Sequence, residues 1–86
     1  MENIFRVSNT TNSRKLASAM MRAIQNNEKI SVRCLGASAI NQAVKAFCIL
    51  RGMGAEVGLD IYFYSIFDMD NDITYIKFYP TINKTF

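Results

Sequence analysis

Histidine is absent from this chain of 86 residues, while cysteine occurs only twice and proline only once. Histidine is the commonest general base and the commonest metal ligand of proteins, so its absence removes the most familiar catalytic and metal-binding arrangements. The serines of the sequence therefore have no histidine partner, and no glycine-rich nucleotide loop accompanies them. We expect a protein that is not an enzyme and that holds no cofactor and no metal.

The two cysteines and the apolar runs exclude further classes of protein. Cys34 and Cys48 match no zinc-binding or redox motif in their spacing, which predicts ordinary reduced thiols. No apolar run approaches the roughly 18 residues that a membrane span requires. The first residues, Met1 to Ile4, are strand-like and carry no signal-peptide pattern. We expect a cytoplasmic protein without a membrane partner.

The residues that are present favour one small folded domain. Half of the chain is apolar and 12% is aromatic, which argues against disorder and allows one modest hydrophobic core. Residues 1–86 are therefore expected to form a single domain. The net charge of +3 permits a polyanionic partner such as nucleic acid, but it does not demand one.

Hydrophobic periodicity and turn residues predict six elements. The expected strands span residues 3–7, 30–35, 59–67 and 73–79, and the expected helices span residues 14–26 and 38–52. Ser38 is expected to cap the second helix and Gly52 to end it. The alternating aspartates of residues 68–72 lack the glycine and glutamate of a calcium loop, so they predict a hairpin turn. Pro80 is expected to end the last strand before a frayed tail.

The resulting order, βαβαββ, predicts the architecture. Helices that alternate with strands imply right-handed crossovers between parallel strands, and the last two strands close as an antiparallel hairpin. Two helices can cover only one face of a four-stranded sheet. The sequence therefore predicts an α/β fold of the α+β kind, a two-layer sandwich in which the second face of a mixed sheet is open.

The stretch from Gly36 to Gly52 combines an apolar helix face with a polar face that could contact a partner. Apolar residues recur there at helical spacing and predict a buried face, which comprises Ile40, Ala43, Val44, Phe47 and Leu50. Asn41, Gln42 and Lys45 cluster on the opposite side within about one turn. Such a polar face is ordinary on a soluble helix, but the amides and the lysine also suit contact with nucleic acid. Cys48 and Ile49 on the same side leave a subunit contact open as a third interpretation.

The chain resembles the stage V sporulation protein S family of the Alba-like group. The resemblance covers nearly the whole chain and is carried by residues 1–8, by the block from Gly36 to Ala46, and by Arg51 and Gly52. It implies an Alba-like sheet in the order 1-2-4-3 with the fourth strand antiparallel to the others. It also implies dimers or higher oligomers, binding of nucleic acid without catalysis, and a role in bacterial sporulation or development.

A second candidate surface lies at the start of the first helix. Arg14 and Lys15 fall in its first turn, where the helix dipole favours acidic residues, and a bound anion would turn this cost into a gain. Hydroxyl groups could join backbone donors around a phosphate there; they belong to Thr10, Thr11 and Ser13. The plain alternative is a solvated polar loop with two incidental cations.

The open face of the sheet is the third candidate surface. Strand alternation places Ser31 and Arg33 on this face and groups side chains of the last two strands, namely Tyr62, Tyr64 and Ile66 with Tyr75, Lys77 and Tyr79. An aromatic and basic sheet can stack unpaired bases. It can equally form a sheet-on-sheet contact between subunits, because exposed apolar patches usually meet a partner.

These features together favour a non-catalytic nucleic-acid-binding regulator that acts as an oligomer through contacts with the phosphate backbone of DNA or RNA. The expected contact residues are Arg14, Lys15, Asn41, Gln42, Lys45 and Arg33. The alternative is a protein-interaction or scaffold module, in which the open sheet face and the outer helix face mediate assembly without nucleic acid.

Overall fold

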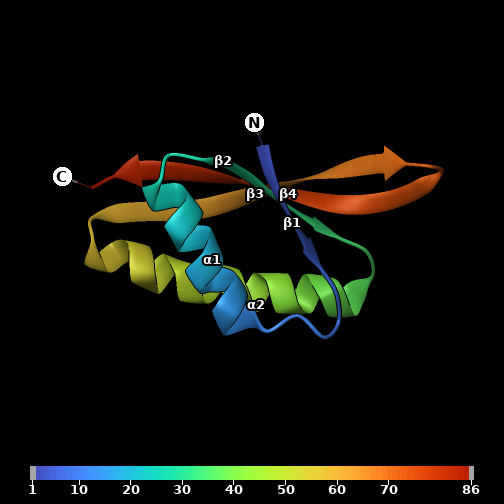
Figure 1. Ribbon diagram of the computed structural model, residues 1–86, viewed down its shortest axis with the longest axis horizontal. Coiled ribbons are helices and arrows are strands. Elements are labelled where there is room, and N and C mark those ends of the chain that lie inside the picture. Colours follow the sequence, from blue (N-terminus) through green and yellow to red (C-terminus); the bar gives the residue numbers. More distant parts are fainter. Residues whose placement is uncertain (1, 86) are drawn as a thin grey trace.

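The computed structural model describes residues 2–85 and contains two helices and four strands in the predicted βαβαββ order. The elements are β1 (Glu2–Val7), α1 (Ser13–Gln25), β2 (Lys29–Cys34), α2 (Ala37–Glu56), β3 (Leu59–Asp70) and β4 (Ile73–Lys84). The strands form one sheet in the order β1-β2-β4-β3, and both helices lie on the same side of it (Figure 1). The predicted two-layer, Alba-like sandwich is therefore confirmed.

The register of the sheet follows from the hydrophobic pattern of its strands. β1 and β2 are parallel and pair Phe5 with Val32, whereas β4 is antiparallel to both of its neighbours. Val32 is fully buried in the core, and the residues beside it in β2 therefore point to the other face. A slip by one residue would move this apolar set away from the helices, so the core itself selects the register.

Small side chains allow the two helices to approach each other and the sheet. α2 buries Ala39, Ala43 and Ala46 along one face, and α1 buries Met20 completely. Burial of a large apolar side chain such as Met20 contributes about 1.5–3 kcal/mol. The predicted inner face of α2 was wrong at Val44, whose side chain is 44% exposed. The alanines occupy the centre of the buried face, which rotates Val44 onto its flank.

The second helix differs from the prediction at both ends. Gly36, with φ of 89°, holds the N-cap position without a side-chain hydrogen bond, and Ser38 lies within the helix. α2 also continues through Gly52 to Glu56. Gly54 is buried, and a Cβ there would lie 2.7 Å from the Cδ1 atom of Ile61. This glycine allows close contact with β3 rather than ending the helix.

The β3–β4 hairpin is longer than predicted. Its turn comprises only Asn71 and Asp72, both with positive φ, between the paired residues Asp70 and Ile73. Such a two-residue turn matches the twist of antiparallel strands, so the preceding aspartates remain within β3. The hairpin tip extends beyond the helix layer (Figure 1).

Pro80 does not end β4, contrary to the prediction. β4 continues to Lys84 because Pro80 remains paired with Phe63 of β3. The pairing with β2 ends at Val32 and Phe78, which leaves the β2 side of Pro80 unpaired. A proline is tolerated where a strand has no partner to receive its missing N–H group. Residues 81–84 are therefore strand rather than frayed tail.

Candidate nucleic-acid interface

The loop before α1 is ordered by its own hydroxyl and amide side chains. Asn12 caps α1 by accepting a hydrogen bond from the backbone N–H of Lys15 at 2.9 Å. The Ser8 N–H group donates to Oγ1 of Thr11 at 2.9 Å, and the hydroxyls of Ser8 and Thr10 lie 3.0 Å apart. The threonine hydroxyls that were expected to receive a phosphate therefore already have partners within the loop.

Gln42 joins this loop to α2. Its Nε2 atom donates a hydrogen bond to the carbonyl oxygen of Thr11 at 2.7 Å, across 31 residues of sequence. The contact brings two of the predicted surfaces, the start of α1 and the outer side of α2, into one region. Gln42 is half-buried and its amide is engaged, so its role there is to position the loop.

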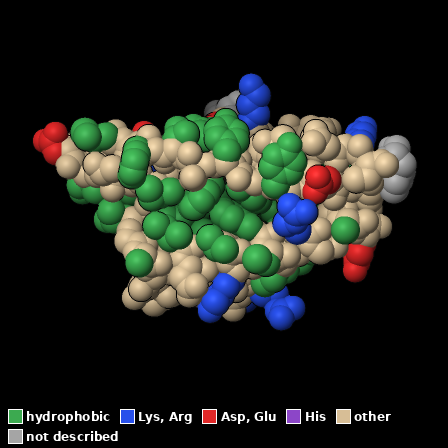
Figure 2. Space-filling view, turned by 180° about the vertical axis from the view of Figure 1, so that it is seen from behind, with side chains coloured by type: hydrophobic (Ala, Val, Ile, Leu, Met, Phe, Trp, Pro, Cys, Tyr) green, Lys and Arg blue, Asp and Glu red, His purple; other side chains and the backbone are tan. Residues whose placement is uncertain are grey.

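The exposed cations of this region are Arg14 and Lys15 in the first turn of α1 and Lys45 on α2. None of them forms a salt bridge with any residue from 2 to 85, and Asn41, one turn before Lys45 on α2, is exposed. The sequence also contains no acidic residue between Asn3 and Asn27. Figure 2 shows lysine and arginine side chains along the lower edge of the molecule, under the helix layer. The part of the helix layer around Arg14, Lys15 and Lys45 thus presents positive charge that no ion pair within residues 2–85 neutralises.

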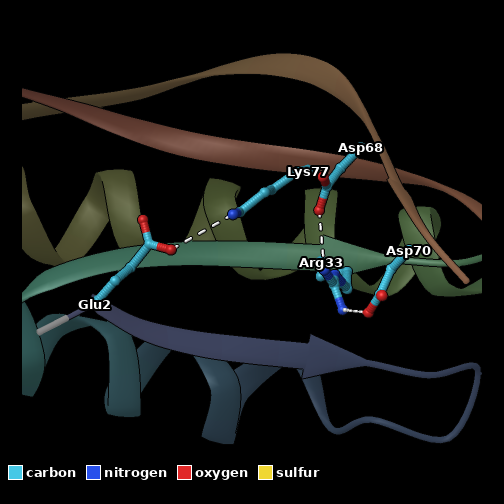
Figure 3. A network of polar contacts seen from close by, with 5 residues as sticks. All are labelled: Glu2, Arg33, Asp68, Asp70 and Lys77. Carbon is cyan, nitrogen blue, oxygen red and sulfur yellow. Dashed lines mark hydrogen bonds and ion pairs between the residues drawn. The ribbon is translucent and has the colours of Figure 1, made fainter.

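Arg33 lies apart from this surface, on the opposite face of the sheet. Its guanidinium group pairs with Asp68 at 2.9 Å and with Asp70 at 3.4 Å, and its side chain is only 16% exposed (Figure 3). It also stacks over the ring of Tyr75 at 4.6 Å. The hydrogen bond that Arg33 donates to Asp68, followed by the charges of both aspartates, raises the pKa of Arg33 despite partial burial. Its charge is balanced within the molecule.

The Arg33 cluster was missed because residues 68–72 were assigned to a turn. Asp68 and Asp70 instead alternate within β3 and project to the same face as Arg33 of β2. The sequence signal for this cluster is the spacing of two residues between the aspartates, since it places both side chains on one side of a strand.

The aromatic side chains of the last two strands are grouped as expected. Tyr64 lies opposite Tyr79, and their rings stack with centroids 5.4 Å apart. Lys77 lies 5.2 Å from the centre of the Tyr79 ring and pairs with Glu2 at 3.4 Å (Figure 3). Its interaction with the Tyr79 side chain, followed by the Glu2 carboxylate, raises the pKa of Lys77.

An apolar surface on the helix side of the sheet was not anticipated as a separate feature. Phe67 and Met69 are 78% and 67% exposed near the hairpin tip. Figure 2 shows hydrophobic side chains gathered in a hollow between the strand layer and the helix layer. Phe47 of α2 stacks on Phe63 of β3 with ring centroids 3.9 Å apart, so Val44, one turn earlier, lies on the same β3-facing flank.

Across residues 2–85, neither helix combines the length and hydrophobicity needed to cross a membrane. The family model described as Stage V sporulation protein S (SpoVS) matches residues 3–79, which include all six elements wholly or in part. The chain therefore belongs to the bacterial stage V sporulation protein S family, and this membership supports a sporulation-related role.

Proposed function

We propose that this protein is a non-catalytic nucleic-acid-binding regulator of sporulation or development, which acts as an oligomer through contacts with the phosphate backbone. The observation that carries the proposal is the basic surface formed by Arg14, Lys15 and Lys45, with Asn41 one turn before Lys45. The Gln42–Thr11 hydrogen bond holds its two halves together. We no longer place Arg33 in this contact surface, since two carboxylates already bind it.

Phosphate contacts suit the composition of this surface. Lysine and arginine supply charge and asparagine supplies hydrogen bonds, and such contacts position nucleic acid without reading its sequence. The first turn of α1 contains no acidic residue, so the positive end of its dipole reinforces the two cations there. A bound phosphate would relieve a repulsion that costs roughly 0.3–1 kcal/mol for each exposed cation.

Oligomerisation would strengthen a contact that is weak in a single subunit. Three cations give a modest affinity, but two linked surfaces bind the same polymer with the advantage of high effective concentration. The exposed apolar surface around Phe67 and Met69 supports a second copy as the partner, because monomers rarely leave such a patch in water. The aspartates at the hairpin tip would repel phosphate, which favours nucleic acid on the helix layer.

The proposal predicts a salt-dependent binding that is specific to the basic surface. Binding of the purified protein to a 20-base-pair duplex and to single-stranded RNA would be measured across a salt series. We expect the double variant Arg14→Ala/Lys15→Ala to bind less tightly, and to flatten the duplex log–log slope by about 0.9 for each lost phosphate contact.

The matched control removes the same charge elsewhere. Arg51→Ala/Lys84→Ala also deletes two cations, but Arg51 pairs with Asp60 at 3.3 Å, outside the proposed surface. This control should retain nearly all of the affinity and slope. If both double variants lost the same affinity, net charge rather than the proposed surface would explain the effect. If the wild-type protein failed to bind at low salt, the proposal would be refuted.

A scaffold function remains the second candidate, and the exposed apolar surface favours it. Under this hypothesis the protein assembles with itself or with other proteins, and nucleic acid is irrelevant. Light scattering separates the two candidates when it is combined with the salt series. An oligomer that fails to bind nucleic acid at low salt would support the scaffold, whereas a strict monomer would contradict it.

A further inference from the structure

A hollow interrupts the sheet between β2 and β4. The pairing of these strands comprises Val32 with Phe78, Arg33 with Lys77, and Cys34 with Ile76. Beyond Phe78 the two strands are no longer paired, and a pocket of about 360 Å³ opens between them. Its lining residues are Glu2, Glu28, Lys29, Ile30, Tyr64, Tyr79, Pro80 and Ile82.

The lining combines three kinds of surface. Ile30, Pro80 and Ile82 supply apolar contacts, and the stacked rings of Tyr64 and Tyr79 form an aromatic wall. The remaining lining residues are charged and come from the first positions of β1 and β2 and from the turn before β2. Apolar and aromatic contacts with a few polar groups suit a flat ring whose edge forms hydrogen bonds.

The charges around the pocket indicate that the bound ring of the ligand is neutral. A cationic ligand would lie over the Tyr79 ring and beside the Glu2 carboxylate. Lys77 already occupies this position, because it lies over that ring and pairs with Glu2. Lys29 balances the charge of the second carboxylate, that of Glu28. Two carboxylates and two ammonium groups therefore cancel, and the pocket favours neither a cation nor an anion. Its volume lies near the lower end of the roughly 300–1,000 Å³ of ligand pockets, which suits a single ring system.

We propose that this hollow binds one nucleobase that carries an exocyclic amino group. The tyrosine wall would stack on the base, as aromatic side chains do in single-strand binders. Glu28 would accept a hydrogen bond from the amino group, the pairing that carboxylates make with cytosine. Its Oε1 atom receives only a long contact of 3.5 Å from Asn3 and has acceptor capacity to spare. The inference extends the proposed function from phosphate contacts to base recognition on the other side of the sheet.

The test compares two ligands that differ at one group. Cytidine and uridine, and the six-nucleotide RNAs C6 and U6, would be titrated into the full chain and followed by amide chemical shifts. We expect C6 to bind more tightly than U6 and both cytidine ligands to shift the resonances of Lys29, Tyr64 and Tyr79. Free nucleosides report the pocket alone, whereas the oligonucleotides add the phosphate backbone.

Two variants assign the binding to the pocket. Tyr64→Leu should weaken binding of both oligonucleotides by roughly 5- to 150-fold, the equivalent of one lost base stack. Tyr64 is 54% exposed, so this change should leave the fold intact. Glu28→Gln should bring the affinities for C6 and U6 together, because an amide can also donate to the oxygen of uracil.

The outcomes separate this inference from the proposed function. Arg14→Ala/Lys15→Ala should leave the cytidine shifts unchanged, and Tyr64→Leu should leave duplex binding unchanged. Cytidine shifts without any duplex binding would uphold the pocket and refute the phosphate surface. Absence of shifts with all four ligands, equal binding of C6 and U6, or preferential binding of arginine methyl ester would overturn the nucleobase proposal.

Discussion

At the scale of single residues, Ser31 combines full burial with an unsatisfied polar group. Its hydroxyl oxygen is completely buried and has no hydrogen-bond partner within residues 2–85. Strand alternation correctly placed Ser31 on the face away from the helices, but it could not reveal burial there, because burial depends on side chains from other parts of the sequence. A buried hydroxyl without a partner costs about 1–3 kcal/mol of desolvation.

We predict that Ser31→Ala raises the free energy of unfolding by about 1 kcal/mol, since it removes the hydroxyl without leaving a large cavity. Urea denaturation of wild type and variant measures the difference. Ser65→Ala serves as the control, because Ser65 is an exposed serine in β3 and should change stability by less than about 0.5 kcal/mol. Destabilisation by Ser31→Ala would mean that the hydroxyl has a partner in solution.

Cys34 gives a prediction about pH. Burial raises the pKa of this thiol from 9.0 to about 11 in the folded protein. The folded state therefore keeps the proton where the unfolded state loses it, and stability should fall as pH rises from about 9 to about 11. Lys77 acts in the same direction, because its pKa is also raised. We expect Cys34→Ala to show a shallower alkaline loss than wild type in urea titrations at successive pH values.

The exposed Cys48 provides the control for the alkaline loss. Cys48→Ala should keep the full pH dependence of wild type. A thiol reagent at neutral pH should modify one sulfur of the native protein, and both sulfurs after denaturation. An unchanged alkaline slope in Cys34→Ala would show that another group causes the loss.

At the scale of elements, hydrophobic pattern predicted each helix and strand, whereas the ends of elements depended on tertiary contacts. Gly52 and Pro80 are residues that usually end a helix or a strand. Here α2 and β4 continue past them, because α2 packs on β3 and β4 pairs with β3 along its whole length. Local sequence cannot report such contacts between distant segments.

The two glycines of α2 offer a direct test of this difference. A Cβ at Gly54 would lie 2.7 Å from Ile61 and 3.1 Å from the carbonyl oxygen of Leu59, while a Cβ at Gly52 meets nothing within 4 Å. We expect Gly52→Ala to stabilise the protein by about 0.5–1 kcal/mol through helix propensity. Gly54→Ala should destabilise it, because overpacking of about 1–3 kcal/mol exceeds the same gain.

Thermal and urea denaturation of both glycine variants provide the measurement. The opposite signs of the two changes are the informative result, since both substitutions have the same effect on intrinsic helix propensity. Stabilisation by Gly54→Ala would show that α2 can move away from β3 without loss. Destabilisation by Gly52→Ala would show that this exposed part of the helix has an unrecognised contact.

At the scale of the whole molecule, charge is separated in a way that sequence order only partly predicts. The first helix and its loop contain cations without acids, which was visible in the sequence and placed Arg14 and Lys15 in the candidate surface. The pairing of Arg33 could not be predicted in this way, because its partners Asp68 and Asp70 lie 35 and 37 residues away in the sequence. The Gln42–Thr11 contact and the pocket beside β2 likewise arise only on folding.

The arrangement of the whole molecule also determines which face of the sheet contacts a second copy of the protein. Ile66 and Phe67 are neighbours in β3 that point to opposite faces, the open face and the helix side, and they are 43% and 78% exposed. We predict that the protein is an oligomer in light scattering, and that Phe67→Lys shifts it to monomers. A lysine there would have to be buried without a partner in the interface. Ile66→Lys adds the same charge on the other face and should leave the oligomer unchanged.

The paired variants also test the competing interface. Both side chains are exposed in a single subunit, so neither change should unfold it, and circular dichroism would verify that the fold is kept. Dissociation by Ile66→Lys alone would place the subunit contact on the open sheet face, where it would compete with the proposed base pocket. Dissociation by Phe67→Lys alone would leave that face free for nucleic acid. A wild-type monomer at all concentrations would refute an oligomer on either face.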